Sequence, residues 1–200
     1  MKIVLASANK GKIKEFKAYL KGFEVLSFDE VMTPFDIEET GSSFKENALI
    51  KSRAVFEKID DKNVIVLSDD SGISVPLLNG APGIYSARYA GIEADAKKNL
   101  ELLVNNLKLK NVSITPAFYT ACIALSTVKG DFSVHGYMYG NATTNPKGTN
   151  GFGYDPMFIP EGFTKTLGEL DDEVKEKFSH RAKALNLAKI LLRTLVKDKK

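Results

Sequence analysis

Short aliphatic runs alternate along the chain with longer amphipathic stretches. Residues 64–67 form an unbroken aliphatic run, which is typical of an interior strand buried on both faces of an α/β sheet. Further strands are expected at residues 2–6, 24–28, 118–127 and 132–139. The Lys-Gly-Asp turn at residues 129–131 predicts that the last two form a hairpin.

Between the strands, apolar residues recur every three or four positions, which predicts helices with one buried stripe. Such stripes run from Ile13 to Leu20, from Phe44 to Ile59, over residues 94–107 and from Leu185 to Leu195. Ser43 and Glu46 have the spacing of a capping box, which opens the second helix. Strands alternating with helices predict an α/β fold, and no repeat or linker divides the chain.

Two carboxylates follow the aliphatic run directly, in the segment Ser-Asp-Asp-Ser-Gly at residues 68–72. Because open α/β sheets bind ligands beyond the carboxyl ends of their strands, a site is expected here. Side chains alternate along a strand, so Asp69 and Asp70 should point opposite ways, one toward the site and the other supporting it. The alternative is a plain turn, which these residue types also favour.

Residues 7–12, Ser-Ala-Asn-Lys-Gly-Lys, join the first strand to the first helix. A strand, a short polar loop and a helix start present backbone N–H groups and the positive end of the helix dipole to an anion. Lys10 and Lys12 add charge to this candidate phosphate site. The spacing is not that of a Walker A loop, and a plain capped helix start is the alternative.

The second helix has polar residues at its start and on its apolar side. Asn47 and Lys51 lie one turn apart on that side, so either Lys51 extends past the edge of the core or both residues line a cleft. Glu38 and Glu39 precede the helix, where carboxylates are common because they complement the helix dipole. Alone, these two residues assign no function.

Two later segments suggest nucleotide binding. Residues 145–156 contain three glycines and two aromatic residues, a composition that suits a planar base and equally suits a tight structural loop. His180 and Arg181 open the last helix, where two cations are unfavourable unless an anionic partner is present. Arg88 lies in a Gly- and Pro-containing loop and either clamps a ligand or closes the surface.

Composition narrows the class of protein. The chain has 200 residues and a formal net charge of +3, too small an excess to indicate nucleic-acid binding. Cys122 is the single cysteine and lies in an apolar strand pattern, so we expect a packing residue. No secretory or membrane-spanning pattern is evident, so no membrane association and a cytoplasmic location are expected.

Six segments, in this order, carry a resemblance to one family: residues 7–12, 38–48, 68–72, 81–89, 151–156 and 179–181. Together they resemble the inosine triphosphate pyrophosphatase (Ham1/RdgB-like) family of noncanonical purine nucleoside triphosphate pyrophosphatases. Ser7-Ala8 replaces a common Thr-Gly, and Thr149-Asn150-Gly151 replaces a common Thr-Gly-Gly. The first change keeps the hydroxyl and the second keeps one glycine.

The resemblance implies hydrolysis of ITP, dITP and XTP to the monophosphate and pyrophosphate, which clears them from the nucleotide pool. It implies Mg²⁺ as cofactor and a homodimer. It also implies that residues 1–200 form one domain, with an elongated two-lobed α/β fold, a long mixed sheet and a nucleotide-binding cleft between the lobes.

The resemblance also implies roles for individual residues. Asp70 is expected to be the general base and a metal ligand, and Glu38 the other metal ligand, with Glu39 and Asp69 assisting. The triphosphate is expected on Ser7, Ala8, Asn9, Lys10, Gly11 and Lys12. The rest of the nucleotide pocket is expected to comprise Ser71, Phe152, Gly153, Tyr154, Asp155, Lys175, His180 and Arg181.

The residues agree with this chemistry. Mg²⁺ prefers oxygen ligands and keeps several waters, so one or two carboxylates plus substrate phosphates suffice. The sequence has no Cys/His cluster, which argues against a zinc site. A nucleotide-binding module without turnover and a phosphatase for other nucleotides are the alternative functions. The residues do not decide which phosphorus is attacked.

Overall fold

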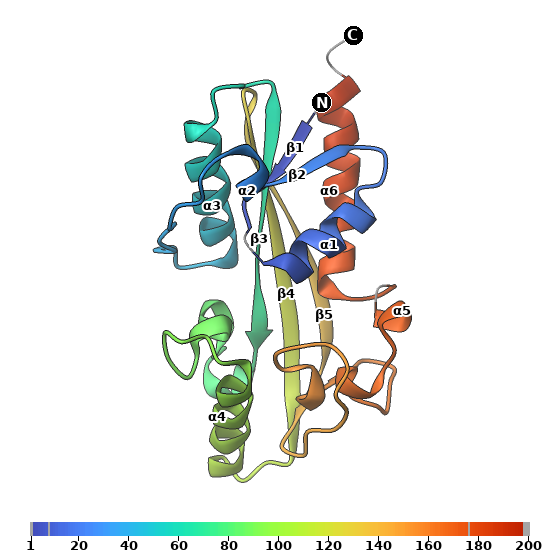
Figure 1. The fold of residues 1–200 in the computed structure, drawn as a ribbon. Coiled ribbons are helices and arrows are strands. Elements are labelled where there is room, and N and C mark those ends of the chain that lie inside the picture. Colours follow the sequence, from blue (N-terminus) through green and yellow to red (C-terminus); the bar gives the residue numbers. More distant parts are fainter. Residues whose placement is uncertain (1, 8, 176, 198–200) are drawn as a thin grey trace. The chain divides into compact units, whose positions relative to one another are not determined.

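The computed structural model describes residues 2–7, 9–175 and 177–197 (Figure 1). Its strands are β1 (Lys2–Leu5), β2 (Glu24–Ser27), β3 (Val64–Ser74), β4 (Ile114–Thr127), β5 (Gly130–Thr143) and β6 (Phe158–Pro160). Its α-helices are α1 (Lys10–Tyr19), α2 (Phe28–Val31), α3 (Phe44–Lys58), α4 (Ala96–Leu109), α5 (Asp172–Lys175) and α6 (His180–Lys197). Short 3-10 helices occur at Pro76–Leu78, Gly83–Arg88, Asp155–Met157 and Leu167–Glu169.

The strands form one mixed six-stranded sheet in the order β2-β1-β3-β4-β5-β6. β1 pairs in parallel with both β2 and β3, and β5 pairs antiparallel with β6. The α/β class and the mixed sheet expected from the sequence are therefore confirmed.

The chain divides into two compact units. The first contains the residues up to Asp70, residues 121–135 and the residues from Lys183 onward. The second contains residues 71–120 and 136–182. The boundary within β3 falls between Asp70 and Ser71, inside the acidic segment singled out above. The cleft expected between lobes stays a prediction.

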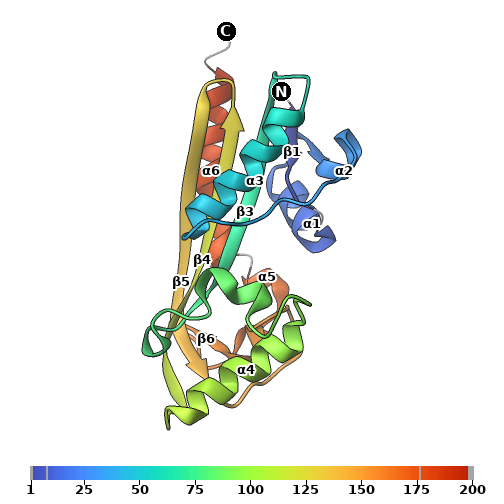
Figure 2. The same cartoon turned by 90° about the vertical axis from the view of Figure 1, so that its left-hand side faces the viewer.

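In the first unit, strand alternation explains why β3 is apolar on both faces. Ile65 and Leu67 point to one side and pack with α6, for example with Leu185. Val64 and Val66 point to the other side and pack with Val55 of α3. Figures 1 and 2 show α6 and α3 on opposite sides of the strands, as this alternation requires. Cys122 is buried and faces Ala48 of α3, so its expected packing role is confirmed.

The interpretation of residues 69–72 as a turn is wrong. β3 continues through them to Ser74, and Ile73 and Val75 are fully buried in the core of the second unit. Burial of these two side chains outweighs the turn preference of Asp, Ser and Gly, because propensity is a weak term beside tertiary packing. The two carboxylates therefore lie within a strand and not beyond its end, which also corrects the expectation that the strand stops there.

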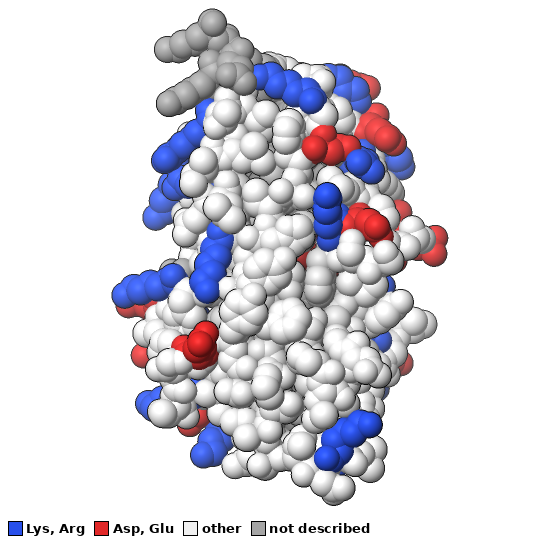
Figure 3. Space-filling view, turned by 180° about the vertical axis from the view of Figure 1, so that it is seen from behind, with Lys and Arg blue, Asp and Glu red and all other residues white. Residues whose placement is uncertain are grey.

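In the second unit, one side of the β4–β5 hairpin is aromatic and exposed. Ala117, Tyr119 and Met138 point into the core beneath α4. On the other side Tyr137 and Tyr139 are 41% and 57% exposed, and Phe118 packs beside Tyr139. A groove of about 600 Å³ lies there, with Phe118, Tyr139 and Phe163 in its lining. The view from behind shows an uncharged area bordered by charged side chains (Figure 3).

Among the described residues, no helix has both the length and the apolar character needed to cross a membrane.

Candidate active site

The two neighbouring aspartates of β3 engage lysines from different helices. Asp69 points to the side of α1, where its Oδ2 lies 2.7 Å from Lys12 Nζ. Asp70 points to the side of α3, where its Oδ1 lies 3.4 Å from Lys51 Nζ. The expected opposite orientation is therefore confirmed, and it follows from the strand continuing through both residues.

Asp70 is the centre of a buried, charged cluster in the first unit. Burial raises the pKa of Asp70, Lys51 opposes the rise and Glu39 adds to it. Lys51 also pairs with Glu39, with Nζ 3.1 Å from Oε1. Asp70 Oδ2 is buried without a hydrogen-bond partner among the described residues. Lys51 thus holds two carboxylates together and, being only 14% exposed, does not extend past the core edge.

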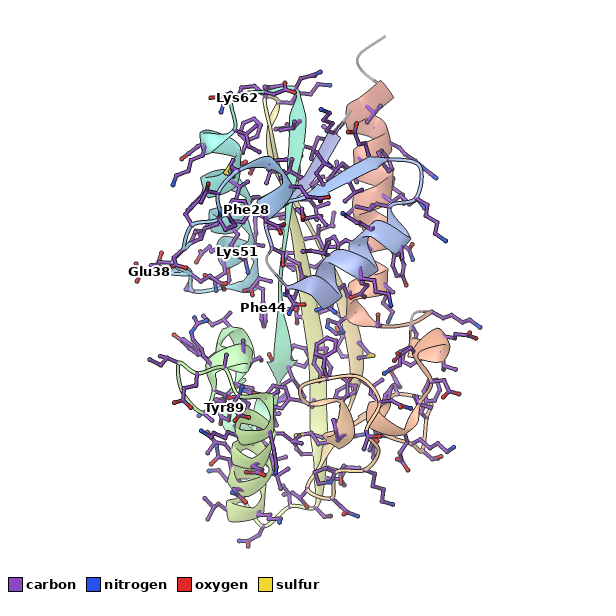
Figure 4. The ribbon with its side chains drawn as sticks, in the orientation of Figure 1. Phe28, Glu38, Phe44, Lys51, Lys62 and Tyr89 are labelled. Atoms are coloured by element: carbon purple, nitrogen blue, oxygen red, sulfur yellow. The ribbon has the colours of Figure 1, made fainter. Side chains whose placement is uncertain are left out.

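Glu38 is not part of this cluster. Its side chain is exposed, and no described residue forms a hydrogen bond or ion pair with it. Figure 4 shows Glu38 at the outer edge of the loop that precedes α3, while Lys51 lies nearer to β3. Its role as a metal ligand stays a prediction, and Glu39 is the glutamate that the structure brings to Lys51 and Asp70.

The candidate phosphate loop leads into helix α1, whose N-terminus is capped. Asn9 is the N-cap of α1, and its side chain accepts a hydrogen bond from the Lys12 backbone N–H at 3.1 Å. The Asn9 N–H is in turn bonded to Ser7 Oγ. Gly11 lies in the first turn, where a Cβ would come within 3.2 Å of Asn9 Oδ1. Ala8 lies outside the described residues, and Lys10 is described only in its backbone.

A second cluster lies in the second unit, at the start of α6. The His180 ring stacks on Tyr119, with ring centroids 4.7 Å apart and planes 15° apart. Arg181 is almost fully buried, and its Nη2 donates to Ser71 Oγ at 3.0 Å. The Arg181 guanidinium also lies 5.8 Å from the centroid of the Phe152 ring. The Arg181 guanidinium, the His180 ring and the exposed Phe152 ring are thus held together, a combination that suits an anionic, planar ligand.

Asp155 joins this cluster through the loop that carries Phe152. Burial raises its pKa to about 6, against the Phe152 backbone hydrogen bond and the charges of Lys175 and Arg181. Asp155 Oδ2 accepts the Phe152 N–H at 3.2 Å and lies 3.9 Å from Lys175 Nζ. Gly151 has a positive φ and no room for a Cβ beside Asp155, which explains a glycine there.

Tyr154 and Arg88 each contact another residue of the second unit. The Tyr154 ring is buried, and its hydroxyl donates to the Ser86 carbonyl at 2.8 Å, so Tyr154 ties its loop to the 3-10 helix that contains Ser86. Gly153 has a positive φ of 60°, a conformation that favours glycine. Arg88 lies over the Tyr85 ring, 5.2 Å from its centroid.

Comparison with known proteins identifies the family. The Ham1 family matches residues 3–190. The chain belongs to the Ham1 family. A dITP/XTP pyrophosphatase of Nautilia profundicola is 56% identical over 195 residues, which cover 98% of this chain and 99% of the relative. One of Sulfurimonas denitrificans is 54% identical over 199 residues, which cover 98% and 100%.

Solved structures of Ham1 proteins have the same fold. The Staphylococcus aureus Ham1 protein superposes with a TM-score of 0.88 at 39% identity, over 97% of this chain and 99% of that one. A Ham1 protein from Coxiella burnetii gives 0.87 at 36% identity, with the same coverage. The resemblance drawn from the motifs is therefore confirmed.

Sequence reasoning missed one residue of the cluster at the start of α6 in this Ham1-family chain. Tyr119 supports His180 from an inward-facing position of β4. Nothing in the sequence distinguishes it from an ordinary strand residue, because the stacking depends on a helix that begins about 60 residues later.

Proposed function

We propose that this chain hydrolyses ITP, dITP and XTP to the nucleoside monophosphate and pyrophosphate, which removes these nucleotides before polymerases use them. The names of the relatives at 54–56% identity support this substrate class. The observation that carries the proposal is the Asp70 carboxylate, buried beside Lys51 and Glu39 and with one oxygen unsatisfied. A buried carboxylate with a raised pKa suits a general base.

We also propose Mg²⁺ as the cofactor, because the donors present are carboxylate oxygens. The unsatisfied Asp70 Oδ2 and the nearby Glu39 fit a hard cation. Within the described part of the chain no three His, Cys, Asp or Glu side chains group as a metal cage, which suits an ion that shares its coordination with phosphates and water. Asp70 would hold the ion with Glu38 or Glu39, and the bound ion would neutralise phosphate charge.

In the proposed reaction, Asp70 accepts a proton from the attacking water. Its raised pKa makes it a stronger base than an exposed aspartate. The triphosphate is assigned to the start of α1, where backbone N–H groups and the Lys12 ammonium offset negative charge. Asp69 keeps Lys12 oriented, and Lys51 adds a second positive charge next to Asp70.

The purine is assigned to the cluster at the start of α6. Hypoxanthine and xanthine have a C6 carbonyl where adenine has an amino group. A donor from His180, Arg181 or a backbone N–H satisfies the carbonyl and leaves the adenine amino group mispaired, which a buried polar site penalises strongly. We propose that GTP is excluded because its 2-amino group meets an unfavourable donor contact. Crowding alone would also exclude XTP, which has a carbonyl at the same position.

Steady-state kinetics across ITP, dITP, XTP, GTP and ATP, with and without Mg²⁺, test the proposal. Pyrophosphate release is followed through an inorganic pyrophosphatase, and the nucleotide product is identified by chromatography. We expect Mg²⁺-dependent turnover of the first three substrates. Binding without turnover would indicate a non-catalytic nucleotide-binding module, and a preference for pyrimidine triphosphates would indicate a different phosphatase. Comparable turnover of GTP and ITP would refute the exclusion argument.

We propose that the protein is a homodimer formed through the exposed aromatic face of the second unit. Tyr137 and Tyr139 stack there with centroids 6.3 Å apart. A face whose exposed side chains are mainly aromatic is compatible with its own copy in a symmetric interface. Tyr139→Glu should convert the dimer to a monomer in light scattering, whereas Ile92→Glu, at an isolated exposed position, should not. A cytoplasmic location stays a prediction.

A further inference from the structure

Asn47 is a fully buried amide on α3, one turn before Lys51. Its Oδ1 accepts a hydrogen bond from the Gly41 N–H at 2.8 Å. Its Nδ2 has no hydrogen-bond partner among the described residues. An unsatisfied buried donor lowers stability, so the position is not explained by packing alone, which an apolar side chain would serve better. The contact that the amide does make is therefore the informative one.

The Gly41 contact joins the acidic loop to the helix at very close range. A Cβ on Gly41 would lie 2.6 Å from Glu46 Cβ and 2.7 Å from Asn47 Oδ1, so the loop backbone lies directly against the first turn of α3. The next residue strengthens the attachment, because the Ser42 N–H and hydroxyl both donate to Glu46 Oε2. Only glycine permits this approach.

This attachment determines where the glutamates lie. Glu39 is two residues before Gly41, and it meets Lys51, one helical turn after Asn47. Lys51 in turn reaches Asp70. The loop and the helix are thus linked twice, once by the Asn47 amide and once by the Lys51 ammonium, with the Glu39 carboxylate held near Asp70.

We propose that Asn47 is a positioning residue for the Mg²⁺ site: by binding the Gly41 N–H, it holds the loop so that the Glu39 carboxylate can share an ion with Asp70. Asn47 touches neither metal nor substrate in this role. The inference rests on the Mg²⁺ dependence proposed above. Residues that orient metal ligands typically change metal affinity by 10- to 100-fold when they are replaced.

Binding of Mn²⁺, as a spectroscopic substitute for Mg²⁺, tests the inference without turnover. The free-ion signal in electron paramagnetic resonance is titrated with the full chain in the absence of nucleotide. Asn47→Leu, which removes the acceptor, should raise the dissociation constant about 10-fold or more. Asn47→Asp keeps an acceptor for Gly41, so it should not weaken Mn²⁺ binding as Asn47→Leu does, although its added charge at this fully buried position lowers stability. With saturating Mg²⁺, the KM of Asn47→Leu for ITP should change less than about 2-fold.

Asn99 provides a matched control in the second unit. It is also buried, its Oδ1 accepts the Ala90 N–H at 2.6 Å, and its Nδ2 donates to the Ala87 carbonyl. Asn99→Leu should lower the unfolding temperature and leave Mn²⁺ affinity unchanged. A purely structural role of Asn47 would give the same result in Asn47→Leu.

Wild-type Mn²⁺ affinity in folded Asn47→Leu would overturn the inference. Should that variant fail to fold, Gly41→Ala disturbs the same contact from the loop side, and unchanged affinity in it would equally overturn the inference. If the wild-type chain binds no Mn²⁺ and shows no Mg²⁺-dependent turnover, the proposed function fails together with this inference. If the wild-type chain shows Mg²⁺-dependent turnover and both Asn47→Leu and Gly41→Ala keep its Mn²⁺ affinity, only the proposed role of Asn47 is overturned.

Discussion

The Lys12 ammonium lies 2.7 Å from Asp69 Oδ2, and the Asp69 side chain is almost completely buried. One residue further along β3, Asp70 engages Lys51 on the other side of the strand. Consecutive strand residues reach opposite faces, so two adjacent carboxylates can organise two lysines from separate helices. Asp69 therefore orients the cation of the candidate phosphate loop, and Asp70 remains for chemistry.

Asp69→Asn should destabilise the protein by about 2 kcal/mol, because it removes the buried partner of the Lys12 ammonium, whose side chain is 25% exposed. Urea unfolding measures the loss. Glu101→Gln is the control, since its pair with Lys97 is long at 4.0 Å and exposed, and it should change stability by less than about 0.5 kcal/mol. Equal effects of the two variants would show that Asp69 has no special role.

Asp70→Asn should abolish turnover of ITP while nucleotide binding persists. The amide keeps the size of the side chain but cannot accept the proton of the attacking water at neutral pH. The rate should fall at least about 100-fold, a typical contribution of general base catalysis. Calorimetric titration with ITP then measures binding directly. A near-normal rate would contradict the assignment of Asp70 as the base.

Local sequence signals predicted the elements that depend on neighbours in the chain. The aliphatic run at Val64 is buried on both faces as expected, and Ser43 caps α3 with its hydroxyl on the Glu46 N–H. Capping and strand alternation involve residues within a few positions of each other, so a sequence displays them directly. Asp69 and Asp70 also point as alternation predicted.

Features that depend on distant partners could not be predicted in this way. The continuation of β3 past Asp70 requires a second core that includes Ile73, and the Lys51 partners come from a loop and a strand on either side of α3 in the sequence. Such pairings are decided by tertiary packing and are absent from local propensity.

Tyr119→Leu should raise the KM for ITP about 3- to 10-fold with kcat within about 2-fold, because the His180 ring loses its stacking partner. Tyr119→Phe keeps an aromatic ring and should stay within about 2-fold of the wild type in both constants. Initial rates at saturating Mg²⁺ give both values. Unchanged KM in Tyr119→Leu would show that His180 is oriented by other contacts.

Asp155 should make stability fall as pH rises between about 4 and 6. Its pKa is about 6 in the folded chain, against a usual 3.8. In that interval the unfolded chain loses the proton while the folded chain keeps it, so deprotonation favours unfolding. The free energy of unfolding should drop by up to about 3 kcal/mol and then level off above pH 6, since a tenfold change in proton affinity is worth about 1.4 kcal/mol.

Urea unfolding of the wild type and of Asp155→Asn, at a series of pH values from 3.5 to 7, isolates this contribution as a difference between the two. The stability of the wild type relative to the variant should decrease through the interval. The contribution of Glu30 to the free energy of unfolding has the opposite pH dependence, because hydrogen bonds from Ser27 lower the pKa of Glu30 to about 2. The stability of the wild type relative to Glu30→Gln should therefore increase as pH rises through the usual range of a glutamate. A constant difference for Asp155→Asn would mean that Asp155 titrates like an exposed aspartate and is not buried as described.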